Sequence, residues 1–243
     1  MINPRREIDC SLGYVDKTKS PQKSEEIYEE LAQKLGYENY LERRFFIYGC
    51  IDYTDTVYVE RIQNDFANLQ VPDITRYILA INREDNKAEK LAKENGIDFF
   101  RKPIWIYIDS TGGCEDEGMA LINAMVLSAT PVYTVNLSLW YSMGFLIGIC
   151  GHKRYSMPYA KFMFHDGFNG TMGSASRAEE KMAFDKKYER EVVKKIMLGH
   201  SDPKKFNSRT YDKLYPHDNF MMAEKALEYG FIDEIVTDLS VLG

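Results

Sequence analysis

The hydrophobic and polar positions change their period several times along the chain, which predicts alternating strands and helices. "IWIYID" (104–109) is a nearly continuous apolar run, typical of a strand buried on both faces. Residues 115–128 follow with apolar side chains at helical spacing, and "PVYTVN" (131–136) predicts a second buried strand. Strands that alternate with helices in this way favour an α/β fold.

Further elements are predicted on both sides of this central region. Upstream, helices over 24–36 and 54–69 flank a strand, "RRFFIYG" (43–49). Downstream, an apolar helix begins at Ser142. The remaining elements are strands on both sides of Pro158, a long charged helix over 175–198, a shorter helix over 204–211, and a last helix over 222–230 that ends at Gly230.

The domain organisation follows from the same pattern. Residues 1–23 mix Pro, Ser, Lys and Asp without a period, so we expect a mobile N-terminal arm. Residues 24–243 contain no internal repeat and no Pro/Ser-rich linker, which predicts one domain. Residues 71–103 stand apart, because a highly charged helical stretch (82–96) follows a short apolar one; we expect a helical insertion on the surface rather than in the core.

Charge and composition exclude several classes of protein. Acidic residues outnumber basic ones by 37 to 31 and no long basic block occurs, so no nucleic-acid interface is expected. The N-terminus lacks the apolar core of a secretory signal, and the longest uncharged apolar run is too short to cross a bilayer. We therefore expect a cytoplasmic protein without membrane contact. The four cysteines are dispersed, which predicts structural thiols and no metal site.

Ser142 is the first candidate for chemistry, because the helix that it begins is apolar. A buried helix N-terminus offers free N–H groups and a positive dipole end to a developing oxyanion, and Met143 and Gly144 are placed to supply them. The G-x-S-x-G motif of α/β-hydrolases is absent, since Trp140 stands at its first glycine position. Taken alone, Ser142 fits a helix N-cap as well as a nucleophile.

The candidates for a general base and its orienting acid are equally open at this level. His152, His200 and His217 lie in polar or charged turns and are expected to be solvated. His165 ends the apolar strand "KFMFH", so its ring lies where a buried strand meets a loop, as either a base or a hydrogen-bonded edge histidine. Asp218 precedes the apolar "FMMA", where a carboxylate either orients a base or caps the last helix.

A glycine pair, Gly112-Gly113, closes the strand at 104–109 and precedes a helix. Its backbone is able to approach a ligand closely, since no Cβ stands in the way. No G-K-[ST] follows and no G-x-G-x-x-G occurs, so neither a P-loop nor a dinucleotide fingerprint is present.

Taken in order, these motifs resemble one protein family. "STGG", "YSMG", "FMFH" and "HDNFMMAEKALEYGFIDEI" are similar to S-P-G-G, A-S-M-G, M-I-H-Q-P and R-D-x-F-x-(S)-A-x-E-A-x-E-Y-G-L-I-D of the Clp protease proteolytic subunit family, ClpP. The resemblance covers about residues 44 to 236 and is strongest after residue 103. It implies an α/β, crotonase-like fold of repeated β-β-α turns with a protruding handle helix, and seven-membered rings stacked face to face around a chamber.

The resemblance also implies roles for individual residues. Ser142 stands at the nucleophile, His165 at the general base and Asp218 at the acid that orients it, while the backbone N–H groups of Gly113 and Met143 stand at the oxyanion hole. Residues expected to contact substrate are Gly112, Gly167, Gly170, Trp140 and Tyr141. The implied activity is hydrolysis of peptide bonds in unfolded polypeptides, without metal or cofactor, with an AAA+ unfoldase as a possible partner.

Three departures from the family pattern keep alternatives open. Thr111 replaces a proline, Trp140 and Tyr141 are bulky where the family has small residues, and His217 stands where many members carry a ring-coupling arginine. The bulky pair is expected to reshape the specificity pocket. The alternatives are a catalytically silent ring or scaffold subunit and a phage-type protease that matures capsid proteins without an unfoldase. An acyl-CoA enzyme of the crotonase fold is disfavoured, because such enzymes need no Ser/His/Asp set.

Overall fold

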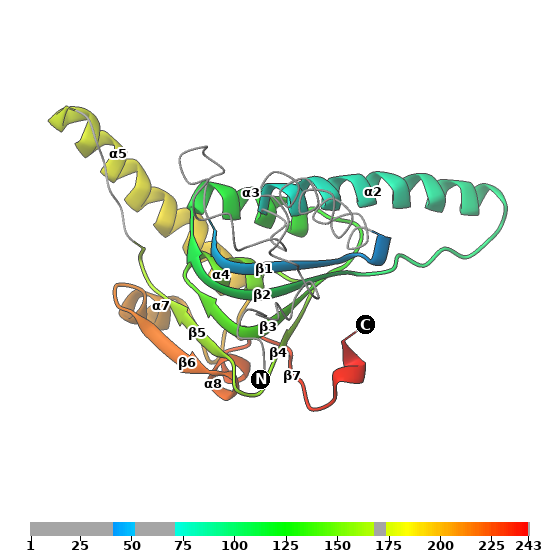
Figure 1. Ribbon diagram of the computed structural model, residues 1–243. Helices are drawn as coiled ribbons and strands as arrows, with labels where there is room; N and C mark the ends of the chain where they lie inside the picture. The colour runs from blue at the N-terminus through cyan, green and yellow to red at the C-terminus, as the bar shows by residue number, and fades with distance from the viewer. Residues whose placement is uncertain (1–40, 52–70, 168–173, 243) are drawn as a thin grey trace, which may run out of the picture.

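The structure, a computed structural model, describes residues 41–51, 71–167 and 174–242. Within them it contains a seven-stranded sheet and helices that pack against it (Figure 1). The predicted arm at 1–23, the predicted helices at 24–36 and 54–69, and Gly170 lie outside the described residues.

The elements follow the predicted alternation. They are β1 (Arg44–Ile51), α2 (Val71–Glu94), β2 (Ile104–Gly113), α3 (Glu115–Val126), β3 (Val132–Tyr141), α4 (Met143–Ile149), β4 (Lys153–Ser156), β5 (Lys161–Phe164), α5 (Ala175–Tyr188), a π-helix (Glu189–Val193), α6 (Lys194–Gly199), α7 (Ser208–Leu214), β6 (Asn219–Met222), α8 (Ala223–Glu228), β7 (Glu234–Ile235) and a 3-10 turn (Leu239–Val241).

Three elements differ from the expectation. The long charged helix is interrupted by the π-helix, and the helix expected at 204–211 begins four residues later, as α7. Of the segment "FMMA" (220–223), expected to open the last helix, the first three residues lie instead in strand β6. This strand exists because its backbone pairs with β5, a non-local contact that local helix propensity does not report.

The sheet is mostly parallel, in the order β1-β2-β3-β4-β7, and β5 and β6 branch from β3. Residues 104 to 108 of β2 are all buried. Ile104, Ile106 and Ile108 belong to the main core under the helices, whereas Trp105 and Tyr107 belong to an aromatic cluster on the opposite face. A strand covered on both sides explains why this segment reads as one continuous apolar run.

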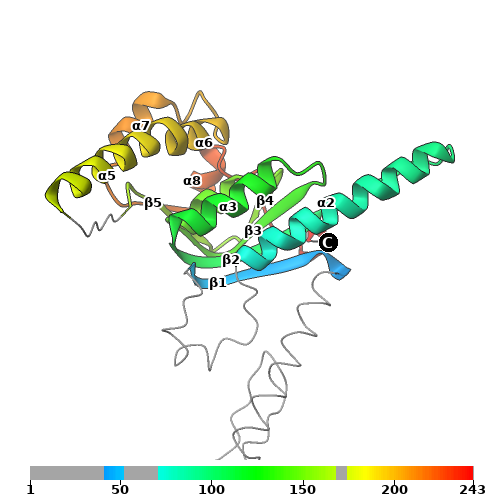
Figure 2. The same ribbon diagram turned by 90° about the horizontal axis from the view of Figure 1, so that it is seen from above.

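Helix α2 corrects the expectation that residues 71–103 form a surface insertion. Ile74, Ile78 and Ile81 are at most 2% exposed and belong to the main core, so the first half of α2 is part of the domain interior. The second half, from about residue 86, is exposed, and it extends beyond the strands (Figure 2). In the sequence, the charged second half makes the apolar stripe of the first half, at i, i+4 and i+7, difficult to recognise.

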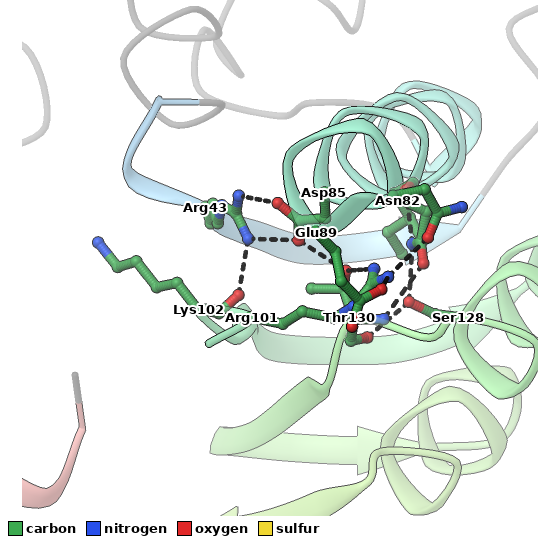
Figure 3. A network of polar contacts seen from close by, with 10 residues as sticks. Arg43, Asn82, Asp85, Glu89, Arg101, Lys102, Ser128 and Thr130 are labelled. Atoms are coloured by element: carbon green, nitrogen blue, oxygen red, sulfur yellow. Dashed lines mark hydrogen bonds and ion pairs between the residues drawn. The ribbon is translucent and has the colours of Figure 1, made fainter. Parts of the chain in front are cut away.

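A polar network fixes the middle of α2 to the end of the sheet (Figure 3). The guanidinium of Arg43 donates to both carboxylate oxygens of Asp85, at 2.9 and 2.6 Å. Thr130 donates its hydroxyl proton to the same carboxylate at 2.7 Å. Arg101 donates to Thr130 and to Glu89, which joins the loop after α2 to the helix. Asp85 is 3% exposed, so its charge is stabilised by these partners rather than by water.

Replacing Asp85 with Asn is expected to destabilise the fold. The substitution leaves the Arg43 guanidinium without its carboxylate, and breaking a buried pair costs about 3–5 kcal/mol. Chemical denaturation would measure the loss of unfolding free energy. Glu94→Gln, on the exposed end of the same helix, is the matched control and should cost less than about 1 kcal/mol. Equal losses in the two variants would show that the network does not anchor α2.

The Asp85 carboxyl group also makes the stability of the protein depend on pH, and the Asp85→Asn variant should differ in this respect. Burial by itself raises the pKa of Asp85, but the hydrogen bonds from Arg43 and Thr130 and the charges of Arg43 and Arg101 outweigh it, so the pKa lies below its usual value. A lowered folded-state pKa stabilises the protein above the unfolded-state pKa of about 3.9, and this stability is lost as the pH falls further. Asp85→Asn should lack this acid-dependent loss.

Candidate active site

The register of three neighbouring strands brings Ser142, His165 and Asp218 together. Strands β3 and β5 pair in parallel with Tyr141 opposite Met163, and Ser142, just after β3, donates its N–H to the Met163 carbonyl at 2.9 Å. Strands β5 and β6 pair antiparallel with Phe164 opposite Asn219. His165 and Asp218 each lie one step beyond that last pair, so the sheet itself places them face to face.

Ser142 lies at a sharp turn between β3 and α4. Its backbone has φ 53° and ψ −121°, a conformation that residues with a side chain rarely adopt. Although Ser142 occupies the N-cap position of α4, its side chain makes no capping hydrogen bond. The strained strand-to-helix turn is the geometry of a nucleophile elbow, reached here without the G-x-S-x-G sequence.

The side chain of Ser142 is directed instead at His165. The Oγ atom of Ser142 lies 2.9 Å from Nε2 of His165. On the other side of the ring, Nδ1 lies 3.2 Å from Oδ1 of Asp218. The loop before Asp218 is held by Asn219, whose amide nitrogen donates to the carbonyls of Leu214 and His217. Asp218 precedes β6, and α8 begins only at Ala223, so Asp218 does not cap the last helix.

The glycine pair after β2 lies against the same turn. Gly112 has φ +93°, and a Cβ there would lie 2.6 Å from Cβ of Ser142 and 3.0 Å from the backbone nitrogen of Met143. Gly113 has φ +145°, and a Cβ there would lie 1.8 Å from the carbonyl oxygen of Ile51. Both positions therefore require glycine. Met143 is the first residue of α4, where a backbone N–H has no acceptor within the helix.

These groups open onto a pocket of about 240 Å³. Its lining contains the predicted oxyanion donors and the Ser/His pair together with side chains from α3, α4, the π-helix and the end of α7. The lining residues are Gly113, Cys114, Glu115, Ser142, Met143, Leu146, Phe164, His165, Asp166, Gly167, Glu189, Val193 and Tyr215. The arrangement combines a hydroxyl, an imidazole and backbone donors at one cavity, with the Asp218 carboxylate next to the imidazole, and this is the set that acyl transfer requires.

Comparison with known proteins gives the family. The model of the Clp protease family matches residues 79–238 of this chain. The chain belongs to the Clp protease family. Curated relatives include the ATP-dependent Clp protease proteolytic subunits of Streptococcus pneumoniae strains CGSP14 and JJA. Each is 30% identical to this chain over 146 residues, which cover 58% of this chain and 71% of the relative.

The match bears on the sequence-based expectations for this Clp protease family member. It confirms the expected family and the α/β fold. It includes Ser142, His165 and Asp218 as well as the Gly112-Gly113 pair. It also begins inside α2, so the second part of that helix lies within the region that the family shares.

The expected contact between Trp140 and substrate is wrong in this structure. Trp140 is fully buried, packs edge-on against Phe162, and faces Gly148 of α4, where a Cβ would lie 2.4 Å from the indole ring. The indole therefore occupies space within the core that Gly148 leaves free. Tyr141 is half-buried and packs edge-on against Phe220 of β6, outside the residues that line the pocket.

The glycines expected to contact substrate are placed differently from one another. Gly167 lines the pocket, and Gly112 lies behind Ser142. Two carboxylates of the pocket, Glu115 and Glu189, were not found by sequence reasoning. The position of Glu115, two residues after the glycine pair, is the signal that would have identified it. Glu189 had no such signal, because it reaches the pocket from a helix far along the chain.

The other histidines are not part of this site. His152 and His217 are exposed, as expected. His200 is not a solvated turn residue: it is half-buried, its Nδ1 lies 2.9 Å from the carbonyl oxygen of Ile196, and burial lowers its pKa. It lines a separate hollow of about 570 Å³ with Arg154, whose guanidinium is engaged by Asp233 and by backbone carbonyls.

The thiols and the helices add two further observations. Within the described residues, Cys50, Cys114 and Cys150 form no disulfide, and burial raises the pKa of Cys150 to about 12, which keeps that thiol protonated. Across the described parts of the chain, no helix is both long and apolar enough to span a membrane.

Proposed function

We propose that this chain is a serine endopeptidase in which Ser142, His165 and Asp218 form the catalytic triad. The observation that carries the proposal is the continuous line of contacts from the Ser142 hydroxyl through the His165 ring to the Asp218 carboxylate, at 2.9 and 3.2 Å. Membership of the Clp protease family supports the same reaction.

In the first half of the reaction, Nε2 of His165 accepts the proton of Ser142 as Oγ attacks a peptide carbonyl carbon. The negative charge that forms on the carbonyl oxygen is stabilised by the backbone N–H groups of Gly113 and Met143. The His165 ring then gives its proton to the leaving amine, and Ser142 retains the acyl group as an ester.

In the second half, a water molecule replaces the amine. His165 takes a proton from this water, the hydroxide attacks the ester carbonyl, and the proton returns to Oγ of Ser142 as the acid product leaves. The Asp218 carboxylate accepts a hydrogen bond from the Nδ1–H of His165, which fixes the ring tautomer and stabilises the imidazolium without taking its proton. Its side chain is 63% exposed, so water screens part of this stabilisation.

The mode of action that fits this site is hydrolysis inside an assembly of like subunits. The relatives are named as ATP-dependent proteolytic subunits, and we extend this to a cytoplasmic ring of this chain that receives unfolded polypeptides from an ATP-driven unfoldase. Helix α5 projects away from the sheet (Figure 1) and exposes Met182 and Phe184. Two exposed apolar side chains on a projecting helix are compatible with a contact between subunits.

A fluorophosphonate probe tests the proposal on the intact chain. The probe reacts only with a serine whose proton is removed by a base, so we expect a single adduct, on the peptide that contains Ser142 in mass spectrometry. His165→Gln should slow labelling by about 10²-fold or more, because the replacement cannot act as a base. A folded chain that never labels, or that labels equally fast without His165, would contradict the proposal and favour a silent ring subunit.

A further inference from the structure

The pocket beside Ser142 has an apolar interior and an acidic outer part. Met143, Leu146, Phe164 and Val193 are each at most 9% exposed and form its inner wall. The carboxylates that line it are nearer the solvent, since Glu115 and Asp166 are exposed and Glu189 is half-buried. The π-helix contributes two of these residues, Glu189 and Val193, and π-helical turns are frequent at functional sites.

The charge around this pocket is strongly one-sided. Three carboxylates line it, and no lysine or arginine is among its described lining residues. The positive charge of Lys181 lowers the pKa of Glu115. However, Lys181 forms an ion pair with Asp185 at 2.7 Å and also interacts electrostatically with Asp116. Its single positive charge is thus shared among several carboxylates. Among the described residues, the acidic side chains that line the pocket therefore outnumber the basic ones, of which there are none.

Electrostatic effects on neighbouring groups point the same way. Although Glu115 is exposed as a whole residue, partial burial of its carboxyl group raises its pKa, and the charges of Asp116 and Asp185 raise it further. Burial also raises the pKa of Tyr215, with Glu189 and Glu115 adding to the effect. A cation beside Glu115 would favour the ionised form of its carboxyl group.

We propose that this pocket binds the side chain of a lysine or arginine at the residue whose carbonyl is attacked, with Glu115 and Glu189 as the specificity-determining residues. The inference rests on the proposed peptidase function and names its substrate class. Lysine and arginine combine an apolar stem with a cationic head, which matches an apolar interior with an acidic mouth. At about 240 Å³, the pocket is smaller than most small-molecule sites, which start at about 300 Å³, so one side chain fills it.

The position of the pocket assigns it to the acyl side of the cleaved bond. When the N–H groups of Gly113 and Met143 hold the carbonyl oxygen of a substrate residue, that substrate residue lies beside Gly113 and Met143. These two residues also line the pocket. The side chain of that substrate residue is the nearest one able to enter. The pocket therefore selects the residue that supplies the carbonyl, rather than the residue that leaves with the amine.

Peptides that differ at one position test the inference. Four coumarin amides would carry Lys, Arg, Leu or Glu before the cleaved bond, and kcat/KM would be measured for each with the full-length chain. We expect Lys and Arg to exceed Leu by about tenfold, and Glu to be the poorest. The double variant Glu115→Gln/Glu189→Gln should lower the Lys-to-Leu ratio by about tenfold. Glu191→Gln, exposed on the same π-helix, is the matched control and should leave the ratio unchanged.

A binding measurement separates this inference from the proposed function. Fluorescent peptide amides ending in Lys or Leu would be titrated onto the Ser142→Ala chain, which cannot hydrolyse them. We expect Lys to bind about tenfold more tightly, and Glu115→Gln/Glu189→Gln added to Ser142→Ala to remove the difference. Equal binding of the two peptides, or tighter binding of Leu, would overturn the inference even if the chain hydrolyses peptides. Absence of hydrolysis alongside a lysine preference would instead count against the peptidase function alone.

Discussion

Replacing Ser142 with alanine is expected to lower kcat/KM for peptide hydrolysis by about 10⁴-fold, with the fold intact. Ser142 supplies the only atom that bonds to the substrate carbonyl in the proposed mechanism, so its loss leaves the backbone donors and substrate binding alone. The small side chain of alanine fits the same turn, because the Oγ atom makes no capping bond within α4. Hydrolysis of an internally quenched peptide and the thermal midpoint would be measured on the same preparation.

Ser240→Ala is the matched control for this variant. Ser240 is exposed in the C-terminal 3-10 turn, far along the chain from the pocket residues, and its replacement should leave kcat/KM within about twofold. If Ser142→Ala kept more than about a tenth of the activity, Ser142 would not be the nucleophile.

The second large effect is expected at Gly113. A Cβ at this position would lie 1.8 Å from the carbonyl oxygen of Ile51, so the backbone must shift in Gly113→Ala. The shift moves the N–H that is proposed to hold the oxyanion, and loss of one such donor costs about 10²- to 10³-fold in kcat. The unfolding free energy should also fall, since φ +145° is unfavourable for alanine.

Gly49→Ala is the control that separates the effect of backbone strain at a positive φ from the effect of moving the Gly113 N–H. Gly49 also has a positive φ, +71°, but a Cβ there meets nothing within 4 Å. This variant should lose about 1 kcal/mol of stability and retain its kcat. Equal kcat values for the two variants would argue against a role for Gly113 in the oxyanion hole.

Much of the fold is visible in the sequence, because the parallel strands are buried on both faces and appear as apolar runs. Strand β2 is such a run, and the apolar residues of α3, which follows it, recur at helical spacing. The core role of α2 is harder to find, since its apolar stripe is short and a charged stretch follows it without a break. Strand β6 is not visible locally, because its pairing with β5 depends on a chain reversal that passes through α5, α6 and α7.

The identity of the candidate site residues can be predicted from the sequence, but their arrangement in space cannot. Ser142, His165 and Asp218 each fit an ordinary structural role when taken alone, and the order of motifs singles them out together. The strand register that joins them requires β6, which the sequence does not predict. The side-chain direction of Trp140 was also inaccessible, because one step along a strand decides whether an indole enters the core or the substrate pocket.

The packing of Trp140 against Gly148 makes these two positions depend on each other. A Cβ at position 148 would lie 2.4 Å from the indole, so a larger residue is tolerated there only if the residue at position 140 becomes small. Conversely, a small residue at position 140 leaves a cavity that a larger residue at position 148 is placed to fill. We therefore expect the two positions to covary among relatives, with a bulky side chain at one or the other but not at both.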